Sequence, residues 1–371
     1  MDVSHEDADA RRRAIFAGLR TQTAVPEETA ANGGVEAEFA DVSDVSGAGV
    51  VAAVEVEADT EPVEAAGAAA EPGEKAGEGA VEGAREPLPG ATSLDGGLLP
   101  TADEAAEPRV VPPLPRILAI ANQKGGVGKT TTAVNLGAAL AELGYRVLVV
   151  DLDPQGNATT GLGINARNLE ASIYDVILHD VPIEDCIEPT SLRNLFVVPA
   201  TIDLAGAEIE LVPAFSRELR LRRAFERLDD EFDFTLIDCP PSLGLLTVNG
   251  LAAATEVVVP IQCEYYALEG LGQLLRNVSL VQGNLNPKLE VSTIVLTMYD
   301  ARTKLADQVA AEVRAHFGAK VCRNIVPRTV RLSEAPSFGQ PIIVFDSSSR
   351  GALAYRELAK EVSGGAPQRF R

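Results

Sequence analysis

Tryptophan is absent from this chain of 371 residues, and aromatic residues make up only 5% of it. Because hydrophobic residues still amount to 46%, the core has to be filled mainly by valine, leucine, isoleucine and alanine. Strands that are buried on both faces of a parallel sheet read as continuous runs of these residues. The composition therefore favours a buried parallel sheet.

Cysteine is also scarce, and its spacing excludes several kinds of site. The four cysteines are Cys186, Cys239, Cys263 and Cys322, and no two of them form a CxxC pair. This spacing argues against a zinc ribbon or an iron–sulfur scaffold, and it favours a reducing compartment without structural disulfides. With three histidines in the whole chain, a histidine-dependent hydrolase is not expected.

Long apolar runs are missing as well. No stretch of about 18 apolar residues occurs, so we expect no segment that spans a membrane. The sequence that follows Met1 is polar and lacks the apolar region of a signal peptide. Together these absences predict a cytoplasmic protein.

Acidic residues are concentrated at the N-terminal end. Of the net charge of −22, −17 belongs to residues 1–114, which hold 24 acidic and seven basic residues. Residues 23–114 are rich in alanine, glycine and glutamate without a helical or strand period, which predicts a disordered acidic linker. Within 1–22, Ile15, Phe16 and Leu19 could share one helix face, which suggests a short docking segment for an unknown partner; a frayed helix or coil is the alternative. Residues 364–371 are expected to form a flexible tail.

Residues 115–363 alternate between apolar strands and helices. We expect strands at 116–121, 146–152, 194–199, 232–238, 256–261 and 291–297, and helices at 129–143, 218–228, 268–281 and 304–317. Strands that alternate with helices predict βαβ units. The expected fold class is therefore α/β, with a doubly wound, mostly parallel sheet flanked by helices, after a long disordered N-terminal extension.

A glycine-rich phosphate-binding loop (P-loop) joins the first expected strand to the first helix. It reads Lys124-Gly125-Gly126-Val127-Gly128-Lys129-Thr130-Thr131. Glycines let backbone amides surround phosphate oxygens, and the helix that follows points its positive end at them. We expect Lys129 to reach the β- and γ-phosphates and the Thr130 hydroxyl to bind Mg²⁺. The strict motif has glycine where Gln123 stands, and Lys124 is an additional lysine.

Carboxylates end two of the expected strands. Asp151 and Asp153 are two residues apart at the end of 146–152, so both side chains are expected to face the phosphate loop. We assign Asp153 to the attacking water and Asp151 to the Mg²⁺ shell; a turn-capping role is the alternative for one of them. Asp238 ends another buried strand, which is the arrangement of a Walker B aspartate that holds Mg²⁺.

Four segments together resemble the chromosome-partitioning ATPases of the ParA/Soj family. They are residues 122–132, 151–157, 238–242 and 330–336, and the resemblance extends over 116–362. The loop with Lys124 is similar to the deviant Walker A motif of the wider ParA/MinD class, in which this lysine reaches the nucleotide of a dimer partner. The resemblance implies that residues 124–131 bind ATP, that Lys124, Lys129 and Asp153 act in hydrolysis, and that Pro327 and Arg328 lie beside the base.

The resemblance also implies a cycle. ATP and Mg²⁺ drive formation of a homodimer, the dimer binds double-stranded DNA on the bacterial nucleoid without sequence preference, and a ParB-type centromere-binding protein stimulates slow hydrolysis. Arg302 and Arg331 match positions that contact DNA in the family. The local charge agrees independently, because residues 301–331 hold seven basic and two acidic residues. Such a basic patch predicts salt-sensitive binding to phosphates.

Two other functions are compatible with parts of the sequence. A MinD-like positioning ATPase that cycles on membranes would share the loop and the aspartates, but it needs a C-terminal amphipathic helix. Residues 364–371 have few apolar side chains and a proline, so we expect no membrane partner. A polar scaffold that acts mainly through its N-terminal extension and hydrolyses little ATP is the second alternative. The acidic extension could also compete with DNA for the basic patch.

Overall fold

The computed structural model describes residues 111–229, 231–264 and 267–365. All of them belong to one compact unit. The expectations for 1–22, and nearly all of those for 23–114 and 364–371, concern residues outside this description. No helix in the described part of the chain combines the length and the apolar character that a membrane crossing requires.

A seven-stranded sheet forms the centre of the described region, in the order β3-β4-β2-β5-β1-β6-β7. Neighbouring strands are parallel, except that β3 and β4 run antiparallel. The strands are β1 (Arg116–Ile120), β2 (Val147–Asp151), β3 (Glu188–Pro189), β4 (Leu195–Val198), β5 (Phe234–Asp238), β6 (Glu256–Gln262) and β7 (Glu290–Thr297). The predicted α/β class and mostly parallel sheet are confirmed, and each expected strand is present within a few residues of its predicted bounds.

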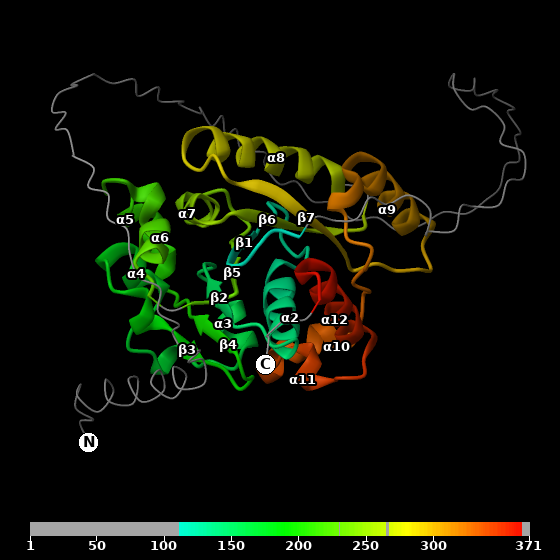
Figure 1. The fold of residues 1–371 in the computed structure, drawn as a ribbon, viewed down its shortest axis with the longest axis horizontal. Helices are drawn as coiled ribbons and strands as arrows, with labels where there is room; N and C mark the ends of the chain where they lie inside the picture. Colours follow the sequence, from blue (N-terminus) through cyan, green and yellow to red (C-terminus); the bar gives the residue numbers. More distant parts are fainter. Residues whose placement is uncertain (1–110, 230, 265–266, 366–371) are drawn as a thin grey trace, which may run out of the picture. The chain divides into compact units, whose positions relative to one another are not determined.

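Helices cover both faces of this sheet. The longer helices are α2 (Lys129–Glu142), α7 (Leu245–Ala253), α8 (Ala267–Asn284), α9 (Lys304–Phe317) and α12 (Arg350–Ser363). The shorter ones are α3 (Asn157–Gly161), α4 (Ile173–His179), α5 (Leu204–Glu210), α6 (Arg220–Glu226), α10 (Val330–Glu334) and α11 (Ile342–Phe345). Short 3-10 turns lie at Ala166–Asn168, Ile183–Cys186, Arg217–Leu219, Gly318–Lys320 and Ala335–Phe338. In Figure 1, α2 and α12 lie on one side of the sheet and α7 and α8 on the other.

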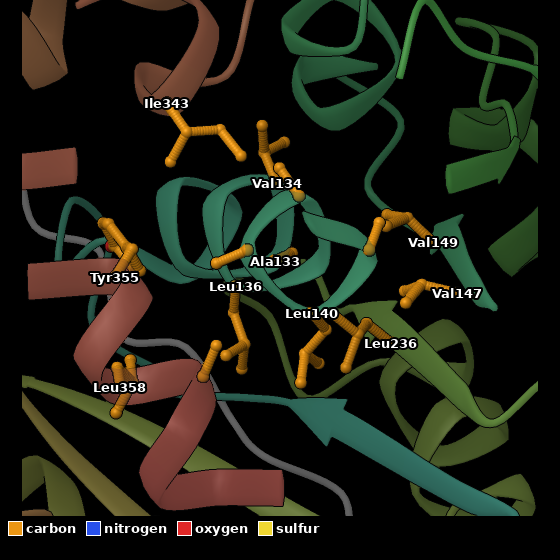
Figure 2. Packing of buried hydrophobic residues seen from close by; sticks show 14 of the residues in the cluster. Ala133, Val134, Leu136, Leu140, Val147, Val149, Leu236, Ile343, Tyr355 and Leu358 are labelled. Carbon is orange, nitrogen blue, oxygen red and sulfur yellow. The ribbon is translucent and has the colours of Figure 1, made fainter. Parts of the chain in front are cut away.

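The core on the α2 side is built from alternate residues of the strands. Val147 and Val149 of β2 belong to the cluster that surrounds α2 (Figure 2). The alternate residues of β2, Leu148 and Val150, are equally buried and belong to the opposite face of the sheet. Gly137 lets α2 approach the sheet closely, since a Cβ atom there would lie 3.0 Å from a methyl group of Val149. This approach places the N-terminus of α2 at the carboxyl ends of the central strands.

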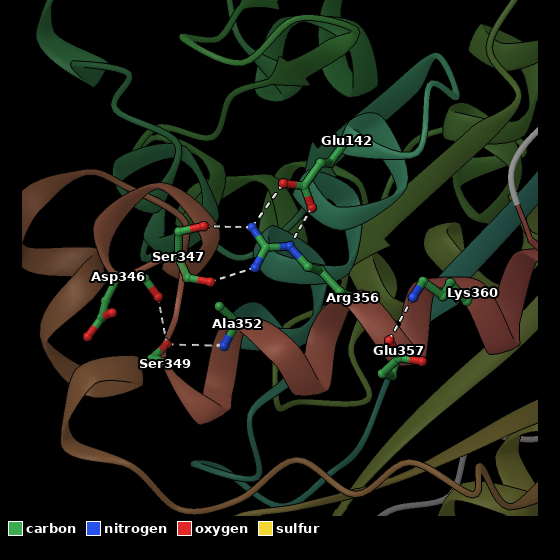
Figure 3. Close-up of polar contacts among 8 residues, drawn as sticks. All are labelled: Glu142, Asp346, Ser347, Ser349, Ala352, Arg356, Glu357 and Lys360. Atoms are coloured by element: carbon green, nitrogen blue, oxygen red, sulfur yellow. Dashed lines mark hydrogen bonds and ion pairs between the residues drawn. The ribbon is translucent and has the colours of Figure 1, made fainter.

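Helix α12 is fixed on α2 by apolar and polar contacts together. Tyr355 and Leu358 are buried in the core on the α2 side. The Arg356 guanidinium donates to both carboxylate oxygens of Glu142, at 2.6 and 2.9 Å, and to the Ser347 carbonyl at 2.5 Å (Figure 3). This helix was not among the predicted elements. Its apolar face is buried in the core, so that face is not exposed for another contact.

Candidate phosphate-binding site

The phosphate loop lies between the end of β1 and the start of α2. Gly126 and Gly128 have φ values of 73° and 90°, in the left-handed region that favours glycine. A Cβ atom built on Gly125 or Gly126 would meet no described atom within 4 Å. The loop therefore exposes its backbone to open space above the first turn of α2, as a cradle for phosphate requires.

Lys129 lies beneath this loop. Its side chain is only 7% exposed, and its Nζ donates to the Lys124 carbonyl oxygen at 3.4 Å. Burial lowers the pKa of Lys129, while the carboxylates of Asp238 and Asp153 act to raise it. A buried ammonium group thus lies between the loop and two of the predicted aspartates.

Asp238 has a buried carboxylate without a partner. The residue is 0% exposed, and neither of its oxygens has a hydrogen-bond partner of normal geometry among the described residues. Burial raises its pKa well above the ordinary value and Asp151 raises it further, whereas the Thr130 hydroxyl and Lys129 lower it. Buried polar groups are normally paired with protein, water or an ion. The two free oxygens of Asp238 therefore fit a cation and its water shell.

Asp151 differs from Asp238 although the two residues are paired in the sheet. The amide and the hydroxyl of Thr159 both donate to Asp151 Oδ2 at 2.7 Å, and the Asp153 amide donates to Oδ1 at 3.2 Å. Burial raises the pKa of Asp151 to about 6. Because its oxygens already accept these bonds, the geometry favours Asp238 over Asp151 as the carboxylate that faces a metal ion. Thr159 is a contributor that the sequence analysis missed.

Asp153 lies at the edge of the same site. It is 8% exposed, and its Oδ1 accepts a hydrogen bond from the Gln155 amide at 3.0 Å. This bond is the turn-capping interaction that the sequence left open for one of the two aspartates. The carboxylate also raises the pKa of Lys129, so Asp153 belongs to the electrostatic surroundings of the buried ammonium group.

Lys124 extends away from the buried ammonium of Lys129. Its backbone amide donates to Asn122 Oδ1 at 3.0 Å, and its Nζ pairs with Glu264 Oε2 at 3.3 Å. The side chains of Lys124 and Glu264 are 37% and 48% exposed. The additional lysine is thus at the surface and held by a carboxylate that follows β6, which the sequence analysis did not predict.

A hollow of about 320 Å³ adjoins the loop. Its walls include Gly128 and Thr131 on one side and Pro327, Arg328 and Tyr355 on the other. We call it the base hollow, because it brings the predicted base-contacting residues next to the predicted phosphate loop. The Thr297 hydroxyl donates to the Val127 carbonyl at 2.8 Å and fixes the loop against the end of β7.

The donor set suits magnesium that is bound together with phosphates. Among the described residues there is no cluster of three or more His, Cys, Asp or Glu side chains that could hold a metal ion by itself. Magnesium bound with nucleotides uses one or two protein oxygens, several waters and the phosphates. The Thr130 hydroxyl and the free oxygens of Asp238 provide such a partial set.

The predicted DNA-contacting arginines lie on the surface outside this site. Arg302, in the loop between β7 and α9, is 88% exposed and pairs with Asp300 at 2.6 Å. Arg331, in α10, is 59% exposed and pairs with Glu334 at 3.1 Å and Asp346 at 3.4 Å. Cys239 is fully buried, and burial raises its pKa, so it is no candidate nucleophile.

Comparison with known proteins relates the described region to one group. A family model described as "AAA domain" matches residues 115–291. The sporulation initiation inhibitor protein Soj of Bacillus subtilis is 60% identical over 248 residues, which cover 67% of this chain and 98% of that protein. The chromosome partitioning protein ParA of Myxococcus xanthus is 56% identical over 258 residues, covering 68% and 91%.

Solved structures share the fold. A Mycobacterium smegmatis structure, named as cobyrinic acid a,c-diamide synthase with bound ADP and magnesium, is 43% identical with a TM-score of 0.59. The similarity covers 70% of this chain and all of that one.

Proposed function

The chain belongs to the Soj/ParA family of chromosome-partitioning ATPases, and from this premise we propose that it is a dimerising switch that ATP turns on and hydrolysis turns off. In its ATP-bound form it binds double-stranded DNA without sequence preference, and a ParB-type protein stimulates its slow hydrolysis. The observation that carries this proposal is the pair of lysines in one loop, one buried beside aspartates and one at the surface.

The buried part of the site suits the triphosphate of ATP. The open loop and the N-terminus of α2 supply backbone donors, and Lys129 supplies a positive charge under the terminal phosphates. Thr130 and Asp238 would hold Mg²⁺, which neutralises charge on the β- and γ-phosphates when it is bound. The base hollow accepts the base against Pro327 and Arg328.

Asp153 would orient the water that attacks the γ-phosphate. It lies near Lys129 and is less enclosed than Asp151, whose oxygens are occupied by Thr159 and by the Asp153 amide. Asp151 is then a positioning residue. It accepts a hydrogen bond from the Asp153 amide and so fixes the turn on which Asp153 lies. Phosphoryl transfer depends mainly on such positioning and on charge stabilisation.

Lys124 would act on the nucleotide of a second subunit. Its surface position and its pairing with Glu264 keep it outside its own phosphate loop. A lysine supplied in trans makes charge stabilisation depend on dimerisation. Formation of the dimer then requires Lys124 to exchange Glu264 for phosphate, and the exposed pair is weak enough to permit this exchange.

The C-terminal helix argues against membrane cycling as the main alternative. The apolar residues of α12, among them Tyr355, Leu358 and Val362, are buried in the core. A helix that lies on lipid must present its apolar face to the membrane. Release of α12 for that purpose would open the core next to α2.

The test is co-sedimentation with DNA in the presence of ATP, ADP or no nucleotide. We expect the wild type to sediment with DNA only with ATP. Lys124→Ala should still bind ATP through Lys129 but lose DNA binding, and Arg331→Ala should keep ATP and lose DNA affinity. Arg227→Ala, which removes an exposed arginine elsewhere, is the control.

The outcomes separate the candidate functions. Equal sedimentation of the wild type with and without ATP would contradict the switch, and binding to lipid vesicles but not to DNA would favour membrane cycling. Binding to neither would favour the scaffold that acts through its N-terminal extension.

A further inference from the structure

A second hollow, of about 380 Å³, lies beside the base hollow. It is lined by the loop at 299–302, by Pro327 and Arg328, and by Arg350 at the start of α12. We call it the arginine hollow. Residues far apart in the sequence thus bring three guanidinium groups to one surface depression, together with a single carboxylate, that of Asp300.

The charges around this hollow are unbalanced. Arg302 donates to both oxygens of Asp300, at 2.8 and 2.6 Å, and these bonds hold the pKa of Asp300 well below its usual range. Arg302 thus pairs with the acid directly, and Arg328 also lowers the pKa of Asp300 electrostatically, without a hydrogen bond to it. Within the described part of the chain, the exposed side chains of Arg328 and Arg350 make no hydrogen bond or ion pair. Two unpaired guanidinium groups face the same space.

The backbone fixes the positions of these arginines. The Tyr299 amide donates to the Val326 carbonyl at 3.2 Å, and the Arg328 amide donates to the Tyr299 carbonyl at 3.0 Å. The start of α12 is held by the Ser349 side chain, which accepts from the Ala352 amide at 3.2 Å (Figure 3). Hydrogen bonds thus hold the backbone of all three segments around the hollow, while the guanidinium groups themselves are exposed.

We propose that the arginine hollow binds a backbone phosphodiester group of double-stranded DNA, with Arg350 and Arg328 as its ligands. This inference rests on the proposed DNA-binding function and adds Arg350, which neither the motifs nor the comparisons single out. It also gives Arg328 a contact with DNA in addition to its place beside the base. Guanidinium groups bind phosphate through paired N–H donors, and groups that are exposed at the surface can reach the phosphates of an extended duplex.

The chemistry favours DNA phosphate over a base edge. Arg328 and Arg350 carry positive charges that no described carboxylate pairs with, and a phosphodiester supplies the negative charge that neutralises them, whereas a guanine edge is neutral. Contacts to phosphate carry no sequence information. A free phosphate ion would use the same donors, and the experiment must separate these two sources.

The experiment measures the affinity of the full chain for DNA, with Mg²⁺ and ATP, between about 50 and 200 mM salt. Arg350→Ala should reduce the magnitude of the negative slope of log K against log salt by up to about 0.9 for each subunit that contacts DNA, since Arg328 remains at the same phosphate. Near 0.1 M salt, this corresponds to an affinity loss of up to about eightfold per subunit. Arg350→Lys should keep most of the slope, and Arg227→Ala should match the wild type.

Two further readouts separate a DNA contact from a structural effect. ATP affinity and the extent of ATP-dependent dimerisation should be unchanged in Arg350→Ala, since its side chain has no described partner. An unchanged salt slope in Arg350→Ala, with wild-type DNA binding intact, would overturn the inference alone. A second result would also overturn it. In that case inorganic phosphate stabilises the wild type but not Arg350→Ala, while both proteins bind DNA equally well. Wild-type protein that fails to bind DNA would overturn the proposed function together with the inference.

Discussion

Replacement of Asp238 by asparagine is expected to stabilise the nucleotide-free protein at neutral and alkaline pH. The Asp238 carboxylate is 0% exposed and neither oxygen has a hydrogen-bond partner of normal geometry among the described residues. Burial and the charge of Asp151 outweigh the effect of Thr130 and Lys129 on its pKa, so its charge is incompletely compensated in the folded state. A buried polar group without a partner costs about 1–3 kcal/mol, and a charged one costs more. Asparagine keeps the shape and removes the charge. We therefore expect the free energy of unfolding to increase by about 1–3 kcal/mol at pH 8.

The sign of the pH dependence follows from the raised pKa of Asp238. A carboxyl group whose pKa is higher in the folded than in the unfolded protein contributes full stability below its unfolded pKa of about 3.9, and this contribution is lost as the pH rises through the folded pKa. Asp151 acts in the same direction, with its pKa raised from 3.8 to about 6. At about 1.4 kcal/mol per unit, Asp151 alone accounts for a loss of about 3 kcal/mol between about pH 4 and pH 6.

Urea unfolding from pH 5 to pH 8, without nucleotide, measures this difference. Wild type and Asp238→Asn should be most similar at the acidic end and diverge as the pH rises. Addition of Mg²⁺ and ATP should stabilise the wild type more than the variant, because ligand binding stabilises the folded state by mass action.

Thr159→Val provides the matched control of opposite sign. It removes the hydroxyl that donates to Asp151 Oδ2 but leaves the buried carboxylate in place, and it should destabilise the protein by about 1–3 kcal/mol. An Asp238→Asn variant that is less stable than the wild type at pH 8 would refute the reasoning, because it would mean that Thr130 and Lys129 stabilise the charged carboxylate by more than burial destabilises it.

Two further substitutions test one exposed and one buried ion pair. Glu264→Gln releases Lys124 from its ion pair. ATP-dependent DNA binding, measured below saturating ATP, should therefore increase about twofold to fivefold, which matches the free energy of an exposed ion pair. A decrease would mean that Glu264 helps Lys124 to act on the partner's nucleotide. Arg116→Ala leaves Glu256 buried without the guanidinium that now binds it at 2.6 and 2.7 Å, and should cost about 3–5 kcal/mol in urea unfolding. The double variant Arg116→Ala/Glu256→Ala should recover part of that loss. If the single and the double variant have the same free energy of unfolding, an unpaired buried charge is not the cause of the loss.

The sequence predicted the sheet because its strands carry an unambiguous local signal. β2 and β5 consist of buried residues throughout, and the glycine-rich loop lies between a strand and a helix as its chemistry requires. β3 was not predicted, because two residues that end in Pro189 have no apolar run or period. Helix α12 was missed although its apolar face is well defined. The expectation for the C-terminal end concerned only whether residues 364–371 could bind a membrane, and not whether a helix before them packs on the core.

Local sequence could not distinguish the two strand-ending aspartates. Asp151 and Asp238 both follow apolar strands and occupy equivalent positions in neighbouring strands. Only the fold brings Thr159 to the oxygens of Asp151 and leaves those of Asp238 free. The same limit applies to Arg350, which lies about 50 residues after Arg302 in the chain but lines the same hollow.

Bound nucleotide can change the affinity for DNA in two ways, by shifting Arg328 and by driving dimerisation, and the two effects on affinity differ in size. Pro327 and Arg328 line both the base hollow and the arginine hollow, so a bound base could shift the Arg328 guanidinium. That change concerns one phosphate contact, or about eightfold in affinity near 0.1 M salt. In the proposed cycle, dimerisation doubles the number of subunits on the DNA. Each subunit then contributes three phosphate contacts, at Arg302, at Arg331 and at the arginine hollow, so dimerisation adds about 500-fold under the same conditions. If the proposed cycle holds, the exchange of Lys124 between Glu264 and a partner's nucleotide therefore has the larger effect on DNA affinity, and a shift of Arg328 in the wall shared by the two hollows has the smaller one.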